Sequence, residues 1–348
     1  MKNILITGGA GYIGSHTAFY LINKGLKVTI IDVLDNGSFE VIKNLKKLIK
    51  INCPKNISNL DFQQGDIRSY KCVNNLFHRK KQVGEDIQSV IHFAGLKSVN
   101  ESFHLPLEYW DVNLNGTINL IKNMDLFNCR KFVFSSSASI YGNSLKKLIK
   151  EDSEIKPTNP YSFTKASCER FLEDLTNDSK KLWSIASLRY FNPIGAHPSG
   201  LIGEVSKRNL NNIFPIINDI GIGNKKILEI YGKDWPTPDG TCLRDYIHVE
   251  DLSEGHFLAL EYLFSHGQNG FISFNIGTGK GVSVLELVNQ FQNINKVKIP
   301  YVFSARRKGD VPILIADNTK AKKILNWSPK RDLKTMCQDG WNWKLLNK

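Results

Sequence analysis

The stretch that decides the fold class is NILITGGAGYIG, residues 3–14. Residues 3–7 form an apolar run of strand length, and an amphipathic segment follows from Tyr12. Between them Gly8, Gly11 and Gly14 stand three residues apart. Glycines allow a sharp turn from strand to helix and let a pyrophosphate approach the backbone amides at the helix N-terminus. The pattern therefore predicts a strand, a dinucleotide-binding turn and a helix.

The alternation of apolar runs and helical segments continues through the first half of the chain. Further strands are expected at residues 27–31, 60–64, 89–94, 131–135 and 183–188, and helices at residues 39–50, 71–81, 107–128 and 161–176. This order predicts an α/β fold, a Rossmann-type doubly wound parallel sheet, over residues 1–190. After Tyr190 glycine and proline become frequent. Residues 191–348 are expected to form a smaller mixed α/β C-terminal substrate domain, with an approximate boundary and interleaved segments.

Composition and charge exclude several classes of protein. The chain has 348 residues, 41% of them hydrophobic, which is enough for a sizeable core. Its formal charge is +13, but only ten of its 46 basic residues are arginine and the lysines are scattered. No nucleic-acid recognition motif accompanies them, so no nucleic-acid partner is expected. No apolar run approaches the ~18 residues that cross a bilayer, so no membrane association is expected. Six scattered cysteines without a CxxC pair predict neither a metal site nor disulfides, as in a cytoplasmic protein.

Residues at the ends of the next three strands predict the dinucleotide. Asp32 ends the second strand, where a carboxylate can bind both ribose hydroxyls and repel a 2′-phosphate, so NAD is favoured over NADP. Asp66 follows the third strand and is expected to meet the adenine amino group. Phe93-Ala94-Gly95 ends the fourth strand, where small residues let the cofactor lie close.

A serine, a tyrosine and a lysine form the expected catalytic group. Tyr161 and Lys165 share one face of a helix, so the ammonium should lower the phenol pKa from about 10 and let it accept a hydroxyl proton. Ser137 ends the fifth strand, which should lie beside the nicotinamide. Tyr20 and Lys24 have the same spacing, but they lie far from the phosphate-binding end of their helix.

Six segments resemble the UDP-glucose 4-epimerase family of the extended short-chain dehydrogenase/reductase superfamily. They are TGGAGYIGSH (7–16), HFAGLK (92–97), SSSASIYG (135–142), RYFNPIGAHP (189–198), RDYIHV (244–249) and RRKGD (306–310). The likeness covers nearly the whole chain. It implies an isomerase with a retained NAD that inverts C4 of a UDP-sugar, interconverting UDP-glucose and UDP-galactose.

The resemblance also assigns residues. Tyr161 is expected to remove the 4-hydroxyl proton, Ser137 to relay it, and Lys165 to hold the cofactor ribose. Cofactor contacts are further expected from Tyr12, Ile13, Asn36, Ile67, Lys97 and Tyr190. Substrate contacts are expected from Lys97, Ser137, Tyr161, Asn192, Asn212, Ile213, Tyr231, Arg244, Arg307, Asp310 and Leu314. Arg244 and Arg307 suit a diphosphate, and Tyr231 suits stacking near uracil. A homodimer through the helices near residues 107–128 and 160–176 is likewise implied.

Several alternatives stay open at this stage. Leu314 stands where some members carry a tyrosine, so the pocket is also expected to admit an N-acetyl group at C2 of a UDP-N-acetylhexosamine. A nucleotide-sugar dehydratase or decarboxylase is the nearest rival enzyme. Ser137-Ala138-Ser139 lacks the acidic residue that dehydratases need there. A non-catalytic NAD sensor is the non-enzyme alternative. Which asparagine near residues 113–115 meets NAD is left undecided.

Overall fold

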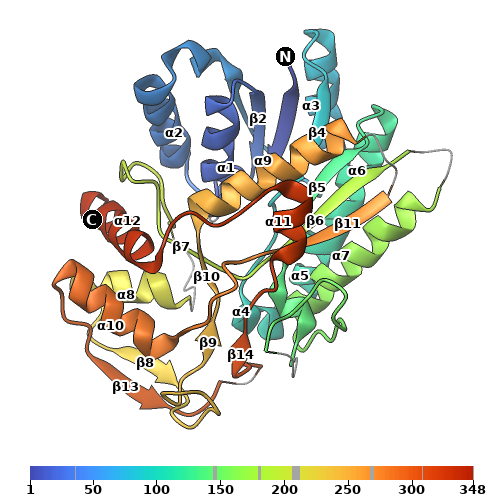
Figure 1. Cartoon of the computed structure of the whole chain (residues 1–348). Coiled ribbons are helices and arrows are strands. Elements are labelled where there is room, and N and C mark those ends of the chain that lie inside the picture. The colour runs from blue at the N-terminus through green and yellow to red at the C-terminus, as the bar shows by residue number, and fades with distance from the viewer. Residues whose placement is uncertain are drawn as a thin grey trace.

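The computed structural model (Figure 1) has a central parallel sheet of seven strands. It describes residues 1–35, 37–143, 147–178, 182–205, 212–266, 270–307 and 309–347. The strand order is β11-β6-β5-β4-β1-β2-β3. The strands are β1 (Asn3–Thr7), β2 (Lys27–Asp32), β3 (Leu60–Gln64), β4 (Ile87–His92), β5 (Lys131–Ser137), β6 (Ser184–Tyr190) and β11 (Gly270–Ile276). The predicted Rossmann-type fold is confirmed.

Helices cover both faces of the sheet because strand side chains alternate between the faces. Ile4 and Ile6 of β1 pack into one core with α1 (Tyr12–Asn23), α2 (Phe39–Asn52) and α9 (Val249–Ser265). Leu5 points to the opposite face of the sheet and packs into a second core, which three further helices cover. These are α3 (Tyr70–Gln82), α6 (Gly116–Leu126) and α7 (Pro160–Thr176). Short 3₁₀ turns occur at η1 (Pro54–Asn59) and η3 (Ala138–Tyr141).

The helix expected over residues 107–128 is interrupted. It comprises α5 (Pro106–Trp110), a π-helical turn η2 (Asp111–Asn115) and α6, preceded by the short α4 (Val99–His104). The prediction of one regular helix was therefore wrong in its middle. Hydrophobic periodicity does not reveal the extra residue of a π-turn, and such turns are frequent at functional sites.

Residues after β6 build a second region beside the carboxyl ends of the main strands (Figure 1). Its strands form three small sheets: β7 (Asn192–Ile194) with β10 (Tyr246–His248), β8 (Leu228–Tyr231) with β13 (Tyr301–Ser304), and β12 (Val282–Ser283) with β9 (Leu243–Arg244) and β14 (Ile313–Leu314). Its helices are α8 (Ile213–Gly221), α10 (Val284–Asn295) and α12 (Leu333–Leu346), whereas α11 (Thr319–Leu325) packs against β11 and α9 at the main sheet. Ser283 caps the N-terminus of α10 in a capping box with Glu286.

The chain returns from this region to the main sheet. Strand β11 pairs with β6 from Gly270↔Ser184 to Ile276↔Tyr190, and α9 packs on α1. The division into residues 1–190 and 191–348 stays a proposal. Among the described helices, none has the length and apolar character needed to cross a membrane.

Candidate active site

A cavity of about 540 Å³ opens at the carboxyl ends of the main strands. Strands β1 and β4 are neighbours whose following helices cover opposite faces, and such a switch point forms a crevice. Nearly all the predicted site residues line this cavity. They are Gly8, Gly11, Tyr12, Ile13, Gly14, Asp32, Asp66, Ile67, Phe93, Ala94, Gly95, Lys97, Ser137, Tyr161, Lys165, Tyr190, Asn192, Asn212, Ile213, Tyr231, Arg244, Arg307, Asp310 and Leu314. Asn36, the remaining one, lies outside the described residues.

The glycine turn is a cradle that side chains would fill. Gly8 has a φ of +70°, and a Cβ there would lie 2.6 Å from the Ala94 nitrogen. A Cβ on Gly14 would overlap the Gly8 carbonyl oxygen. Gly11 caps α1 without a side chain, which leaves the first amides of that helix to an anion. The turn therefore fits the pyrophosphate of a dinucleotide.

Carboxylates lie at the ends of β2 and β3. Asp32 accepts the Ala10 amide at 3.0 Å and the Leu34 amide at 2.7 Å, which fixes its carboxylate beside the glycine turn. Burial raises the pKa of Asp66, but hydrogen bonds and charge from Arg68 outweigh it and hold this pKa below its ordinary value. Both carboxylates suit hydroxyl or amino donors, as a ribose and an adenine offer.

Ser137, Tyr161 and Lys165 meet at one end of the cavity. Tyr161 follows Pro160 at the start of α7, where Asn159 caps the helix by accepting the Ser162 amide at 2.9 Å. The Ser137 side chain lies near enough to the Tyr161 phenol to oppose the rise of its pKa. One turn along α7, Lys165 Nζ donates to the Ser135 carbonyl at 2.8 Å.

The expectation that Lys165 lowers the phenol pKa is wrong for this structure. Burial raises the pKa of Tyr161, and the nearby Ser137 side chain offsets this only in part. The ammonium is directed to the Ser135 carbonyl instead of the phenol. Burial lowers the pKa of Lys165 itself to about 8, against the opposing charges of Cys168 and Glu169.

The structure distinguishes the two asparagines of η2. Asn113 is buried, accepts the Leu96 amide at 2.7 Å and donates to the Thr164 hydroxyl at 3.0 Å. It thus joins the cavity loop at Gly95-Leu96 to the helix that carries Tyr161. Asn115 instead donates to Asp111 at the surface. The π-helical turn sets these two orientations, and the sequence alone did not indicate them.

The other end of the cavity carries the two predicted arginines. Arg307 pairs with Asp310 at 3.1 Å, and Arg244 lies 3.8 Å from the same carboxylate. The Arg307 guanidinium stands 5.3 Å from the centre of the Tyr231 ring. Leu314 lies opposite Arg244 in the β14–β9 pairing and faces the cavity. Two cations and an aromatic ring suit the phosphates and base of a nucleotide.

Glu204 is a cavity residue that sequence analysis missed. It accepts Lys97 Nζ at 2.8 Å and Asn212 Nδ2 at 3.4 Å. Lys97 follows β4, whereas Glu204 and Asn212 come from the second region. The ion pair therefore bridges the cavity. A lone glutamate in a loop carries no sequence signal for such a contact.

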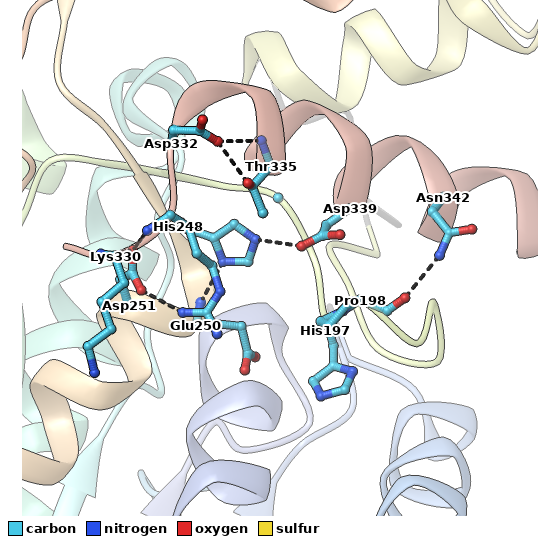
Figure 2. A network of polar contacts seen from close by, with 12 residues as sticks. His197, Pro198, His248, Glu250, Asp251, Lys330, Asp332, Thr335, Asp339 and Asn342 are labelled. Carbon is cyan, nitrogen blue, oxygen red and sulfur yellow. Dashed lines mark hydrogen bonds and ion pairs between the residues drawn. The ribbon is translucent and has the colours of Figure 1, made fainter. Parts of the chain in front are cut away.

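A second layer supports the glycine turn from behind. The Tyr12 hydroxyl donates to the Gly195 carbonyl at 2.7 Å. Figure 2 shows how α12 holds the segment after Gly195: Asn342 Nδ2 donates to the Pro198 carbonyl at 3.1 Å. His248 Nδ1 accepts the Glu250 amide, so His248 Nε2 carries the proton that it donates to Asp339 at 3.2 Å (Figure 2). The C-terminal helix therefore contributes to the shape of the cofactor turn.

Comparison with known proteins gives consistent similarities. Residues 5–340 match the family described as GDP-mannose 4,6 dehydratase. The chain is 45% identical to the bifunctional UDP-glucose 4-epimerase and UDP-xylose 4-epimerase 3 of Arabidopsis thaliana, over 99% of this chain and 96% of the relative. It is 44% identical to the UDP-glucose 4-epimerase of Bacillus subtilis, over 99% and 97%. The solved UDP-glucose 4-epimerase of Stenotrophomonas maltophila, with bound NAD and formylated UDP-arabinopyranose, is 38% identical. It superposes with a TM-score of 0.93 over 100% of this chain and 99% of that one.

Proposed function

The chain belongs to the UDP-glucose 4-epimerase family of extended short-chain dehydrogenases/reductases, and we infer that it interconverts UDP-glucose and UDP-galactose with NAD. The observation that carries this inference is the single cavity with three parts. The glycine cradle at Gly8–Gly14 suits the cofactor, Ser137, Tyr161 and Lys165 stand at the reacting end, and Arg244 and Arg307 suit the diphosphate.

The chemistry divides between cofactor and protein. NAD supplies the oxidant that takes hydride from C4 of the sugar and returns it to the opposite face. Tyr161 accepts the proton of the 4-hydroxyl and gives it back, and the neighbouring Ser137 side chain is placed to relay it. Lys165, held by the Ser135 carbonyl, would bind the cofactor ribose.

Inversion requires that the sugar present both faces to the cofactor while the nucleotide stays bound. Arg244 and Arg307 are anchored through Asp310 on the far side of the cavity from Tyr161. Binding energy is thus concentrated on the diphosphate and base, and the oxidised sugar is free to turn about its phosphate linkage. Asn192, whose Oδ1 has no partner among the described residues, is suited to bind a donor group of the substrate.

The test is a coupled assay that follows UDP-glucose formed from UDP-galactose without added NAD. We expect turnover by the purified protein, and at least a hundredfold loss in Tyr161→Phe, which removes the base. Tyr20→Phe is the matched control, since Tyr20 has the same spacing to a lysine but packs on Phe257. Absence of turnover in a protein that releases NAD on denaturation would contradict the epimerase function and leave the cofactor assignment standing.

We further propose that UDP-N-acetylhexosamines are substrates. Leu314 lines the cavity beside Arg244, and a leucine leaves more space at the sugar than a tyrosine at that wall. The dehydratase alternative has less support, because Ala138 and Ser139 supply no acid after Ser137.

We also propose a cytoplasmic homodimer. All six cysteines are free, as in a reducing compartment. Leu107 of α5 is 85% exposed and Phe163 of α7 is 47% exposed, on two helices that pack together. Exposed apolar side chains on paired helices are typical of an interface between subunits.

A further inference from the structure

A buried histidine stands behind the wall of the cavity. His256 lies in the interior of α9 and is fully buried. Its Nδ1 is 2.9 Å from the Leu252 carbonyl, one turn earlier, and its Nε2 is 2.5 Å from the Tyr190 hydroxyl. Its ring also contacts Phe93, with the ring centres 4.7 Å apart. Tyr190 and Phe93 both line the cavity, whereas His256 does not.

These contacts fix the donor and the acceptor in both hydrogen bonds of the His256 ring. The Leu252 carbonyl can only accept, so Nδ1 of His256 carries the hydrogen. Burial lowers the pKa of His256 to about 3, so the ring is neutral and Nε2 offers a lone pair. The Tyr190 hydroxyl must therefore donate to His256. Burial raises the pKa of Tyr190, and the nearby Ser135 side chain opposes that rise.

The Tyr190–His256 hydrogen bond lies beside the reacting residues. Tyr190 is the direct partner of Ser137 in the β5–β6 register. Ser135, two residues before Ser137, accepts Lys165 Nζ on its carbonyl. The hydrogen bond from Tyr190 thus connects the strand end beside Ser137 to His256 on α9. A change at His256 is therefore felt at the cavity through Tyr190 and Phe93.

We propose that His256 is a positioning residue that holds Tyr190 and Phe93 against the nicotinamide end of the cofactor. It touches neither cofactor nor substrate. The proposal rests on the proposed function in one respect, that this cavity holds NAD.

The experiment compares His256→Leu, His256→Gln, Tyr190→Phe and the double variant Tyr190→Phe/His256→Leu. NAD retained after dialysis is measured by its release on denaturation, and kcat and KM are measured with UDP-galactose. In His256→Leu the Tyr190 proton is buried without an acceptor, so we expect about tenfold faster loss of NAD and a kcat lower by about tenfold. The KM for the UDP-sugar should change little, because the nucleotide contacts lie at the other end. His266→Leu, at the exposed end of the same helix, is the matched control.

Two comparisons separate positioning from mere stability. Gln presents an acceptor oxygen at similar reach, so His256→Gln should recover most NAD retention. The double variant should lose less than the two single variants combined, because both single changes break the same hydrogen bond. If His256→Leu lowers only the melting temperature and keeps NAD and kcat, or if Gln is as damaging as Leu, the proposal is overturned. Since NAD release needs no turnover, these results stay distinct from a failure of the epimerase function.

Discussion

At the scale of the residue, the site depends on side chains whose burial alters their ordinary chemistry. Lys165 is the main case, since burial lowers its pKa to about 8 while its Nζ stays bound to the Ser135 carbonyl. A lysine with a depressed pKa is charged below that value and neutral above it. Its charge is therefore available at neutral pH and is lost on the alkaline side.

This predicts the alkaline limb of the pH profile. We expect kcat/KM to fall about tenfold per pH unit above about pH 8, because Lys165 then loses the positive charge with which it is placed to bind the cofactor ribose at the reacting end of the cavity. The measurement is kcat/KM for UDP-galactose from pH 6 to 10. Lys165→Arg keeps the charge, so whatever activity it retains should lack the limb near pH 8. A wild-type profile that stays flat from pH 7 to 10 contradicts this role.

Leu314 carries the prediction on substrate range. We expect the wild-type protein to epimerise UDP-N-acetylglucosamine, and Leu314→Tyr to lose at least about tenfold of this activity while keeping that on UDP-galactose. A bulkier wall costs only the substrate with the larger C2 group, and pocket contacts of this size change rates by about 10–200-fold. The ratio of the two kcat/KM values measures it, with Leu314→Ile as the control. An inactive wild type toward the N-acetylated sugar refutes the proposal.

At the scale of the element, a network of polar contacts joins the start of α9 to α12 and to the segment before it (Figure 2). Glu250 in the first turn of α9 is 6% exposed, and its Oε1 has no partner among the described residues. Burial raises the pKa of Glu250 to about 7. Arg331 opposes this rise, whereas the carboxylates of Asp251 and Asp339 add to it.

The raised pKa has a definite sign for stability. Glutamate in the unfolded chain titrates at about pH 4.3. Ionisation of Glu250 therefore lowers the free energy of unfolding as pH rises from there, and the whole loss is present above about pH 7. Glu250→Gln removes this cost. We expect it to stabilise the protein by up to about 3 kcal/mol, or roughly 4 °C in melting temperature, at pH 8 and far less at pH 5. Thermal unfolding at both pH values is the measurement, with the exposed Glu261→Gln as control. An equal effect at the two pH values would falsify the assignment.

At the scale of the whole molecule, the cavity lies where two regions of one chain face each other. Lys97 and Glu204 bridge it from opposite sides, and α12 supports the cofactor turn from the C-terminus. The outer face of α5 and α7 remains open, and it carries Leu107 and Phe163.

This open face predicts the oligomeric state. We expect a dimer in solution for the wild-type protein and a monomer for Leu107→Glu/Phe163→Glu, because two carboxylates cannot be buried unpaired in an apolar interface. Light scattering after size exclusion measures the mass. Ile51→Glu, at a 70% exposed apolar position at the end of α2, should leave the dimer intact. A wild-type monomer, or a dimer unaffected by the double change, rules out this interface.

The sequence by itself determined six of the seven strands of the main sheet, the glycine turn and the residues at the strand ends that line the cavity. These depend on local pattern: apolar runs of strand length, glycines where a Cβ has no room, and Pro160 before the helix of Tyr161 and Lys165. Parallel strands bring their carboxyl ends to one edge, so residues at those ends meet whatever the rest of the chain does.

Only the tertiary structure decided which groups pair with one another. Three examples join residues from separate elements: the hydrogen bond from the Leu96 amide to Asn113, the bond of Lys165 to the Ser135 carbonyl, and the bridge from Lys97 to Glu204. The same is true of His256, which is separated from Tyr190 by 66 positions. Such pairs leave no periodic or spacing signal, because packing of the helices on the sheet sets their distances and burial sets their protonation.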